Sequence, residues 1–145
     1  MSCKRSSLGS IAMVALVTAV AMTNLTRSAA PANEGERVFE IRTYTTEPGK
    51  LPDLLKRFRD HTCQLFEKHA MINIGYWVPT DGPRSQNTLI YILAHKSRDT
   101  AKQSWKDFQA DPDWINVKEA SEANGKIVTK VESVFAAPTD FSPIR

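Results

Sequence analysis

Six polar or aromatic side chains could together form a binding site for a small molecule. These candidate ligand-binding residues are Glu40, Arg42, Tyr44, Trp77, Asn87 and His95. Carboxylate, guanidinium, phenol, amide and imidazole groups hydrogen-bond to a bound molecule, and an indole ring stacks on a flat one. Three of them, His95, Glu40 and Tyr44, could also accept a proton in a reaction. The residue types therefore fit either a binding pocket or a small active site.

Several of these residues also have a purely structural interpretation. Glu40 and Arg42 either line a pocket or complete a ladder of charges across neighbouring strands. Trp77 either stacks on a flat ligand or fills the space left by Gly75 in the core. His95 either acts as a base or is a surface or hydrogen-bonded residue at the end of a strand. The sequence leaves these alternatives open.

Metal and covalent chemistry find no support. His61 and His69 are eight residues apart, about 80° around a helix axis. No acidic residue or cysteine joins them at ligand spacing, so we expect no metal site. The sequence contains no nucleophile elbow, phosphate loop, CxxC or HExxH motif, and we expect no cofactor.

The pattern of apolar residues predicts the elements that position the candidate residues. Alternation of apolar and polar residues predicts the first and last strands, and two apolar runs separated by turn-forming residues predict a hairpin. Spacing of three and four residues and cap residues predict the helices. The expected order is strand 38–44, helix 50–70, strand 72–79, strand 87–95, a helix that follows the cap Ser97, helix 113–123 and strand 127–136.

This order is typical of an α+β fold, a ferredoxin-like split βαβ unit with a four-stranded antiparallel sheet and helices on one face. The last strand would lie beside the first. Glu40 and Arg42 would then pair with Lys130 and Glu132 on the sheet face away from the helices. Because Trp77 is expected on that face too, we expect another subunit to cover it and the chain to form a homodimer.

The first 32 residues read as a secretory signal peptide. Lys4 and Arg5 precede an apolar run over 11–22, and Ala30-Pro31-Ala32 fits a cleavage site. The alternatives are an uncleaved anchor and an organellar transit peptide. The run is shorter than the roughly 20 residues that span a bilayer, so we expect an exported, periplasmic or secreted chain with no stable membrane span after cleavage.

Cleavage after Ala32 would change the charge and the cysteine content of the chain. It removes Lys4, Arg5 and Arg27 but no acidic residue, so the formal charge falls from +3 to zero and a nucleic-acid partner loses its support. It also leaves Cys63 as the single cysteine, which excludes an intrachain disulfide. With 145 residues, 41% hydrophobic and 24% charged, one globular domain is expected.

The segment over 38–144 resembles the NIPSNAP family. The resemblance is carried by Glu40-Ile41-Arg42-Thr43-Tyr44, Pro48-Gly49-Lys50, Gly75-Tyr76-Trp77, Asn87, Arg98, Trp105, Asp111-Pro112-Asp113-Trp114 and Phe141-Ser142-Pro143. It implies a dimeric α/β barrel, in which two four-stranded sheets face one another, and no established reaction. The short chain with its signal looks like a bacterial, single-domain member.

Two functions follow as hypotheses. The first is a homodimeric module that binds a small apolar or aromatic molecule or assembles with a partner. The second, by analogy with other dimeric α/β barrels, is a cofactor-independent oxygenase-like enzyme acting on an apolar or aromatic substrate. Whether the chain is an enzyme is left open. Convergence of His95, Tyr44 and Asn87 in a closed cavity would favour the enzyme, and a filled interior would favour assembly.

Overall fold

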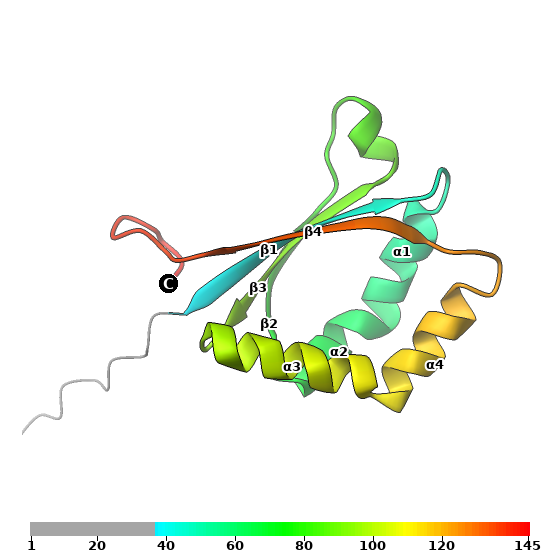
Figure 1. Ribbon diagram of the computed structural model, residues 1–145. Helices are drawn as coiled ribbons and strands as arrows, with labels where there is room; N and C mark the ends of the chain where they lie inside the picture. Colours follow the sequence, from blue (N-terminus) through cyan, green and yellow to red (C-terminus); the bar gives the residue numbers. More distant parts are fainter. Residues whose placement is uncertain (1–36) are drawn as a thin grey trace, which may run out of the picture. The chain divides into compact units, whose positions relative to one another are not determined.

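The computed structural model describes residues 37–145, and the predicted signal segment lies outside them. Figure 1 shows the sheet with the helices on one of its sides. The elements are β1 (Val38–Thr46), α1 (Leu51–Arg57), the π-helix η1 (Phe58–Thr62), α2 (Cys63–Lys68), β2 (Ile72–Trp77), the 3-10 helix η2 (Pro83–Gln86), β3 (Thr88–His95), α3 (Arg98–Ala110), α4 (Pro112–Ser121) and β4 (Val128–Ala136).

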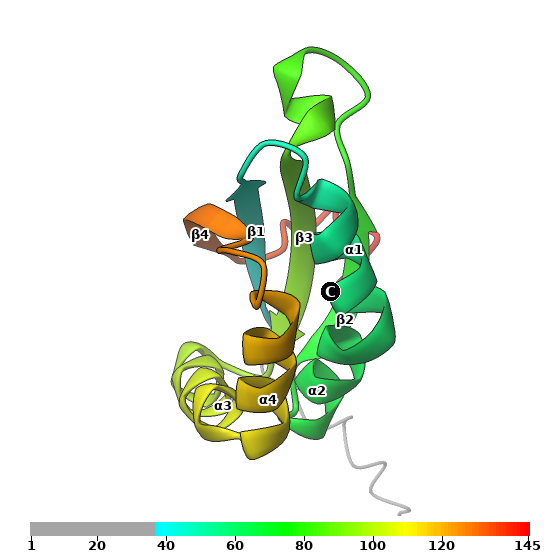
Figure 2. The ribbon, with the colours of Figure 1, turned by 90° about the vertical axis from the view of Figure 1, so that its right-hand side faces the viewer.

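The four strands form one antiparallel sheet in the order β2-β3-β1-β4. The last strand therefore lies beside the first, and the predicted α+β architecture is confirmed. In Figure 2, α1 and α2 lie on the side of β3 and β2, while α3 and α4 lie nearer the β4 edge. Within residues 37–145 no helix is both long and apolar enough to cross a membrane.

The predicted helix over 50–70 is interrupted by the π-turn η1. Leu54, Phe58, Thr62 and Phe66 recur every four residues and are all buried. In a regular α-helix, a four-residue repeat rotates about 40° per step and would leave the sheet face. The wider π-turn counteracts this rotation, and the Thr62 hydroxyl donates to the Arg57 carbonyl at 3.2 Å within it. All four residues therefore stay against the sheet.

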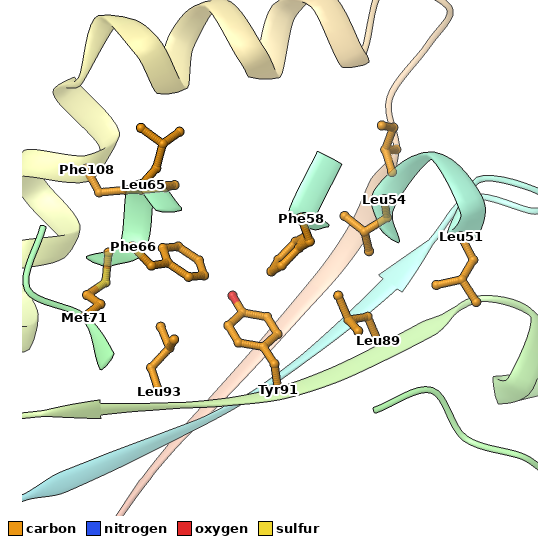
Figure 3. Close-up of a cluster of buried hydrophobic side chains, with 11 residues drawn as sticks. Leu51, Leu54, Phe58, Leu65, Phe66, Met71, Leu89, Tyr91, Leu93 and Phe108 are labelled. Carbon is orange, nitrogen blue, oxygen red and sulfur yellow. The ribbon is translucent and has the colours of Figure 1, made fainter. Parts of the chain in front are cut away.

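The core lies between the sheet and α1, α2 and α3 (Figure 3). Tyr91, in the middle of β3, is fully buried, and its ring stacks on Phe66 with a centroid distance of 5.9 Å. The rings of Phe58 and Tyr91 are arranged edge to face, with a centroid distance of 5.2 Å. This aromatic cluster fixes which side of the sheet the helices cover.

The predicted facing of β1 is wrong. Tyr44 packs against Phe58 and Tyr91, and Glu40 is hydrogen-bonded to Trp105 of α3. Residues that alternate along a strand share a face, so Glu40, Arg42 and Tyr44 all face the helices. Apolar and polar residues do alternate along the strand, but this alternation does not say which of the two sets of side chains the helices cover.

The predicted charge ladder fails for the same reason. Lys130 and Glu132 pair with each other at 3.0 Å and remain exposed. They lie opposite Thr45 and Thr43 in the register, which places them on the face away from the helices. Glu40 and Arg42 lie on the other face, so no ladder joins the two pairs.

Candidate functional site

The site is built around the Glu40 carboxylate, which is 1% exposed and accepts four hydrogen bonds. His95 Nε2 and Trp105 Nε1 donate to Oε2 at 3.0 and 2.7 Å. Ser133 Oγ and Arg42 Nη1 donate to Oε1 at 2.6 and 2.5 Å. The donors come from β3, α3, β4 and β1, so this one carboxylate links three strands and a helix.

These donors determine the charge of Glu40. Burial alone raises the pKa of a carboxyl group, because it disfavours the charged form. The hydrogen bonds from His95, Ser133 and Trp105 and the charge of Arg42 outweigh burial, so the pKa of Glu40 falls from 4.5 to about 2. Glu40 is therefore a carboxylate throughout the physiological pH range.

Arg42 is held flat between aromatic side chains. Its guanidinium carbon lies 4.1 Å from the centroid of the Trp105 ring, and Nη2 donates to the Tyr44 hydroxyl at 3.4 Å. Burial lowers the pKa of Arg42, but the phenols of Tyr44 and Tyr91 and the Glu40 carboxylate raise it overall. The guanidinium stays charged, and 15% of the side chain remains exposed.

A cleft of about 890 Å³ begins at this guanidinium. Its lining residues come from the sheet (Arg42, Tyr44 and Val131), from α3 (Trp105, Phe108 and Gln109), from α4 (Trp114, Ile115, Lys118 and Glu119) and from the residue that caps α4, Glu122. Phe108 lies 4.5 Å from Trp114 and 5.6 Å from Trp105, centroid to centroid. The wall opposite the sheet is thus largely aromatic, and charged groups gather along α4.

Helix α4 has no buried residue and is anchored by polar contacts. Arg57, beneath it, bonds Glu122 and Ser121 at 3.2 Å each, and its guanidinium faces the Trp114 ring at 5.4 Å. At the start of the helix, Asp111 accepts the backbone N–H of residue 113. These contacts hold Trp114 against the cleft.

The structure brings together some of the six predicted site residues. Arg42 and Tyr44 line the cleft, and Glu40 lies directly behind them. His95 joins them only through Glu40. It is 1% exposed, is absent from the cleft lining, and its Nδ1 has no hydrogen-bond partner among the described residues. Glu40, Arg42 and Tyr44 therefore lie together, and His95 contacts this group through Glu40.

Trp77 and Asn87 lie elsewhere. Trp77 is 50% exposed, and its ring lies over Gly75, so close that a Cβ at that position would be only 2.6 Å from the ring. It occupies the space left by Gly75, on the face away from the helices. Asn87 precedes β3, at the opposite end of that strand from His95, and its side chain accepts from Thr88 Oγ1 at 3.0 Å.

Sequence reasoning missed the contribution of the helices and of β4. Trp105, Phe108 and Trp114 are packing residues, as their helical spacing indicates, but they also form the aromatic wall. Their spacing on α3 and at the start of α4 was the available signal. Ser133 gave no signal, because its role depends on lying opposite Arg42 in the register.

The match to known proteins settles the family. A family model for NIPSNAP matches residues 39–143. The chain belongs to the NIPSNAP family. A NIPSNAP family protein of unknown function from Agrobacterium tumefaciens is similar, with 26% identity and a TM-score of 0.66 over 77% of this chain and 96% of that one. A NIPSNAP-like domain protein from Burkholderia xenovorans has 16% identity and a TM-score of 0.65, covering 75% of this chain and 90% of that one.

An enzyme shares the fold of this NIPSNAP domain. A monooxygenase from Streptomyces coelicolor, solved in complex with nanaomycin D, has 15% identity and a TM-score of 0.51, covering 73% of this chain and 89% of that one. At this identity the likeness concerns the fold alone. A search among functionally curated proteins found no match.

Proposed function

We propose that this NIPSNAP domain is a homodimeric module that binds a small aromatic molecule in the cleft between the sheet and helices α3 and α4. The observation that carries the proposal is the Arg42 guanidinium, fixed on Trp105 by the buried Glu40 carboxylate at the wall of a cleft of about 890 Å³. That volume lies in the range of small-molecule sites.

The polar groups are arranged as a binding site needs them. A flexible arginine loses conformational entropy when it binds a ligand. Here Glu40 and Trp105 already hold Arg42 in place, so this conformational entropy is lost when the chain folds and not when a ligand binds. Arg42, Tyr44 and the aromatic wall therefore offer a ligand a preformed surface of apolar rings with a few hydrogen-bond donors.

The same geometry argues against a proton-transfer site built on Glu40 or His95. Glu40 has a pKa of about 2 and accepts four hydrogen bonds, so it is a weak base at neutral pH. His95 gives its Nε2 to Glu40 and does not line the cleft. Asn87 lies outside the cleft as well. Convergence of His95, Tyr44 and Asn87 in one cavity would favour an enzyme, and these three residues do not converge.

An oxygenase-like enzyme acting on an apolar or aromatic substrate is the second candidate. The observation that favours it is the Tyr44 hydroxyl, which lines the cleft beside a charged guanidinium. Consumption of dioxygen in the presence of an aromatic substrate, lost in Tyr44→Phe, would support this candidate over simple binding.

The homodimer rests on the other face of the sheet. Ile41 lies opposite Ile92 and Val134, so the three side chains share this face. Ile41, Val134 and Trp77 are 36%, 61% and 50% exposed, which is unusual for a large apolar surface on a monomer.

A second copy of the chain suits this face. In a two-fold contact the same patch lies on both sides, so the apolar row would meet its own copy. The exposed Lys130–Glu132 pair at the margin of the face contains both signs and would meet its own complement.

The proposal also includes export of the chain from the cytoplasm. An intact mass that begins after Ala32, measured on protein from the cell envelope, would test it.

Titration calorimetry with 2-methylnaphthalene tests binding in the cleft. Val131→Trp places a bulky ring in the cleft and should abolish binding, because Val131 lines it. The matched control is Lys102→Trp, which adds the same ring to the exposed face of α3 and should leave binding unchanged. Binding that survives Val131→Trp, or a wild type that binds neither this probe nor a naphthalene carrying a carbonyl or a carboxylate, would refute the proposed site.

A further inference from the structure

Resting on the proposed function, we infer that the cleft recognises the edge of a flat aromatic ligand through an acceptor oxygen, either a carbonyl or a carboxylate. The inference concerns the chemical class of the ligand. It follows from the direction of the hydrogen bonds around Arg42 and Tyr44.

Arg42 has more donors than partners. A guanidinium carries five N–H groups and no acceptor. One group on Nη1 bonds Glu40 and one on Nη2 reaches the Tyr44 hydroxyl at 3.4 Å, whereas Nε is buried without a partner among the described residues. Nε is too buried for a ligand to reach, but Nη1 and Nη2 each carry a second N–H group. The side chain is 15% exposed and lines the cleft, so an acceptor from a ligand would bond these groups.

Tyr44 adds a donor of the same kind. Its hydroxyl oxygen accepts the bond from Arg42, which leaves its own proton available for another acceptor. Tyr44 lines the cleft together with Arg42. A ligand oxygen at this end of the cleft could therefore accept from both side chains.

The Glu40 carboxylate does not compete for a ligand at this end. The Glu40 carboxylate is 1% exposed and already accepts four bonds, so a donor group of a ligand could not reach it. Glu119 belongs to α4 and Glu122 caps its C-terminal end, across the cleft from the sheet. The sheet end thus selects for an acceptor, and Trp105, Phe108 and Trp114 select for a flat ring.

The charges do not require an anion. Arg42 is balanced by Glu40, and Arg57 by Glu122. On the α4 side of the cleft, Lys118 is matched by Glu119. A neutral carbonyl and a carboxylate share the acceptor chemistry, and the experiment distinguishes them.

Three naphthalene probes test the inference by titration calorimetry: 2-acetonaphthone with a neutral carbonyl, 2-naphthoate with a carboxylate, and 2-methylnaphthalene with no acceptor. At least one acceptor probe should bind about tenfold or more tightly than 2-methylnaphthalene, as one good hydrogen bond allows. The tighter of the two acceptor probes identifies the kind of oxygen that the cleft prefers.

Two variants assign the preference to its donors. Tyr44→Phe keeps the ring that packs on Phe58 and Tyr91 and removes only the hydroxyl, and Arg42→Lys keeps the charge without the planar fork. Each should reduce the ratio of acceptor-probe affinity to 2-methylnaphthalene affinity by about threefold or more, with both affinities measured in the same variant. Thermal melts verify that both variants fold.

Equal affinity for all three probes would overturn the inference and leave the proposed binding site standing. An acceptor preference that persists in both variants would also overturn it, because the donors would then lie elsewhere. Failure of all three probes to bind would refute both the inference and the proposed function.

Discussion

Each face of the sheet departs from the usual pattern at one place. The face beneath the helices buries an ion pair, Glu40 and Arg42, with exposures of 2% and 15% for their side chains. The face away from the helices exposes Ile41, Val134 and Trp77. A buried charge and an exposed apolar surface both call for an explanation, and the proposed binding site on one face and the proposed second copy on the other supply it.

The buried pair is tolerated because its hydrogen bonds are nearly complete. Burying two charges costs more than their attraction returns unless further groups satisfy them. Glu40 has three donors besides Arg42 and one of them is the indole of Trp105, which also stacks on the guanidinium. The exposed pair Lys130–Glu132 has no comparable surroundings and provides the comparison for the predictions that follow.

The largest effect is expected from Arg42→Met. It removes the cation from beside a buried carboxylate, and we expect the free energy of unfolding to fall by about 4 kcal/mol. Adding Glu40→Gln removes the uncompensated charge and should recover a substantial part of the loss. Urea unfolding of wild type, both single variants and the double variant measures this. Small additive effects would show that the face is ordinary wet surface.

Acid should destabilise the protein through Glu40. Its pKa is about 2 in the folded chain and 4.5 when unperturbed, so its contribution is fully present above pH 4.5 and is lost as the pH falls towards 2. The difference between the two pKa values corresponds to about 3 kcal/mol of folding stability. Melts from pH 6 to 2 should show a loss that is clearly smaller in Glu40→Gln. Identical pH profiles for the two proteins would remove Glu40 from the explanation.

A charge on the open face should separate the two subunits. Val134→Lys places an ammonium group in the centre of the proposed contact twice, once from each copy, and should weaken the dimer by about 2 kcal/mol, or roughly 30-fold. Sedimentation across a concentration series measures the dissociation constant, with Lys102→Glu on the exposed face of α3 as the control. A wild type that sediments as a monomer at micromolar concentration would contradict the homodimer.

The smallest effect is expected from Lys130→Met. This substitution breaks the exposed ion pair with Glu132, whose side chains are 63% and 54% exposed. Exposed pairs contribute little, so we expect a change below about 0.5 kcal/mol under the conditions used for Arg42→Met. A change as large as that of Arg42→Met would mean that the two faces are not distinguished by burial.

The order of the elements could be predicted from the sequence because local patterns determine it. Alternation marked the first and last strands of the chain, β1 and β4, and Ser97 caps α3 through the backbone N–H of Thr100, as its residue type indicates. Asp111 followed by Pro112 marked the start of α4 in the same way. These signals act over a few residues and need no knowledge of the fold.

The facing of β1 could not be predicted, because distant partners determine it. Trp105 and Ser133 lie 65 and 93 residues from Glu40, and their donors are part of what makes burial of the carboxylate acceptable. The sequence indicated that Glu40, Arg42 and Tyr44 share a face and could form a pocket. It gave no sign that this row, rather than the row with Ile41, would lie under the helices.

The indole N–H signal of Trp105 tests the central claim most directly, since this group donates to the buried Glu40 carboxylate at 2.7 Å. In ¹H–¹⁵N spectra of labelled protein, the signal should stay constant from pH 7 to about 4, move only as the pH approaches 2, and shift in Glu40→Gln while the Trp77 signal does not. A Trp105 signal that ignores Glu40→Gln, or that titrates near pH 4.5, would contradict a buried, fully hydrogen-bonded Glu40 at the base of the cleft.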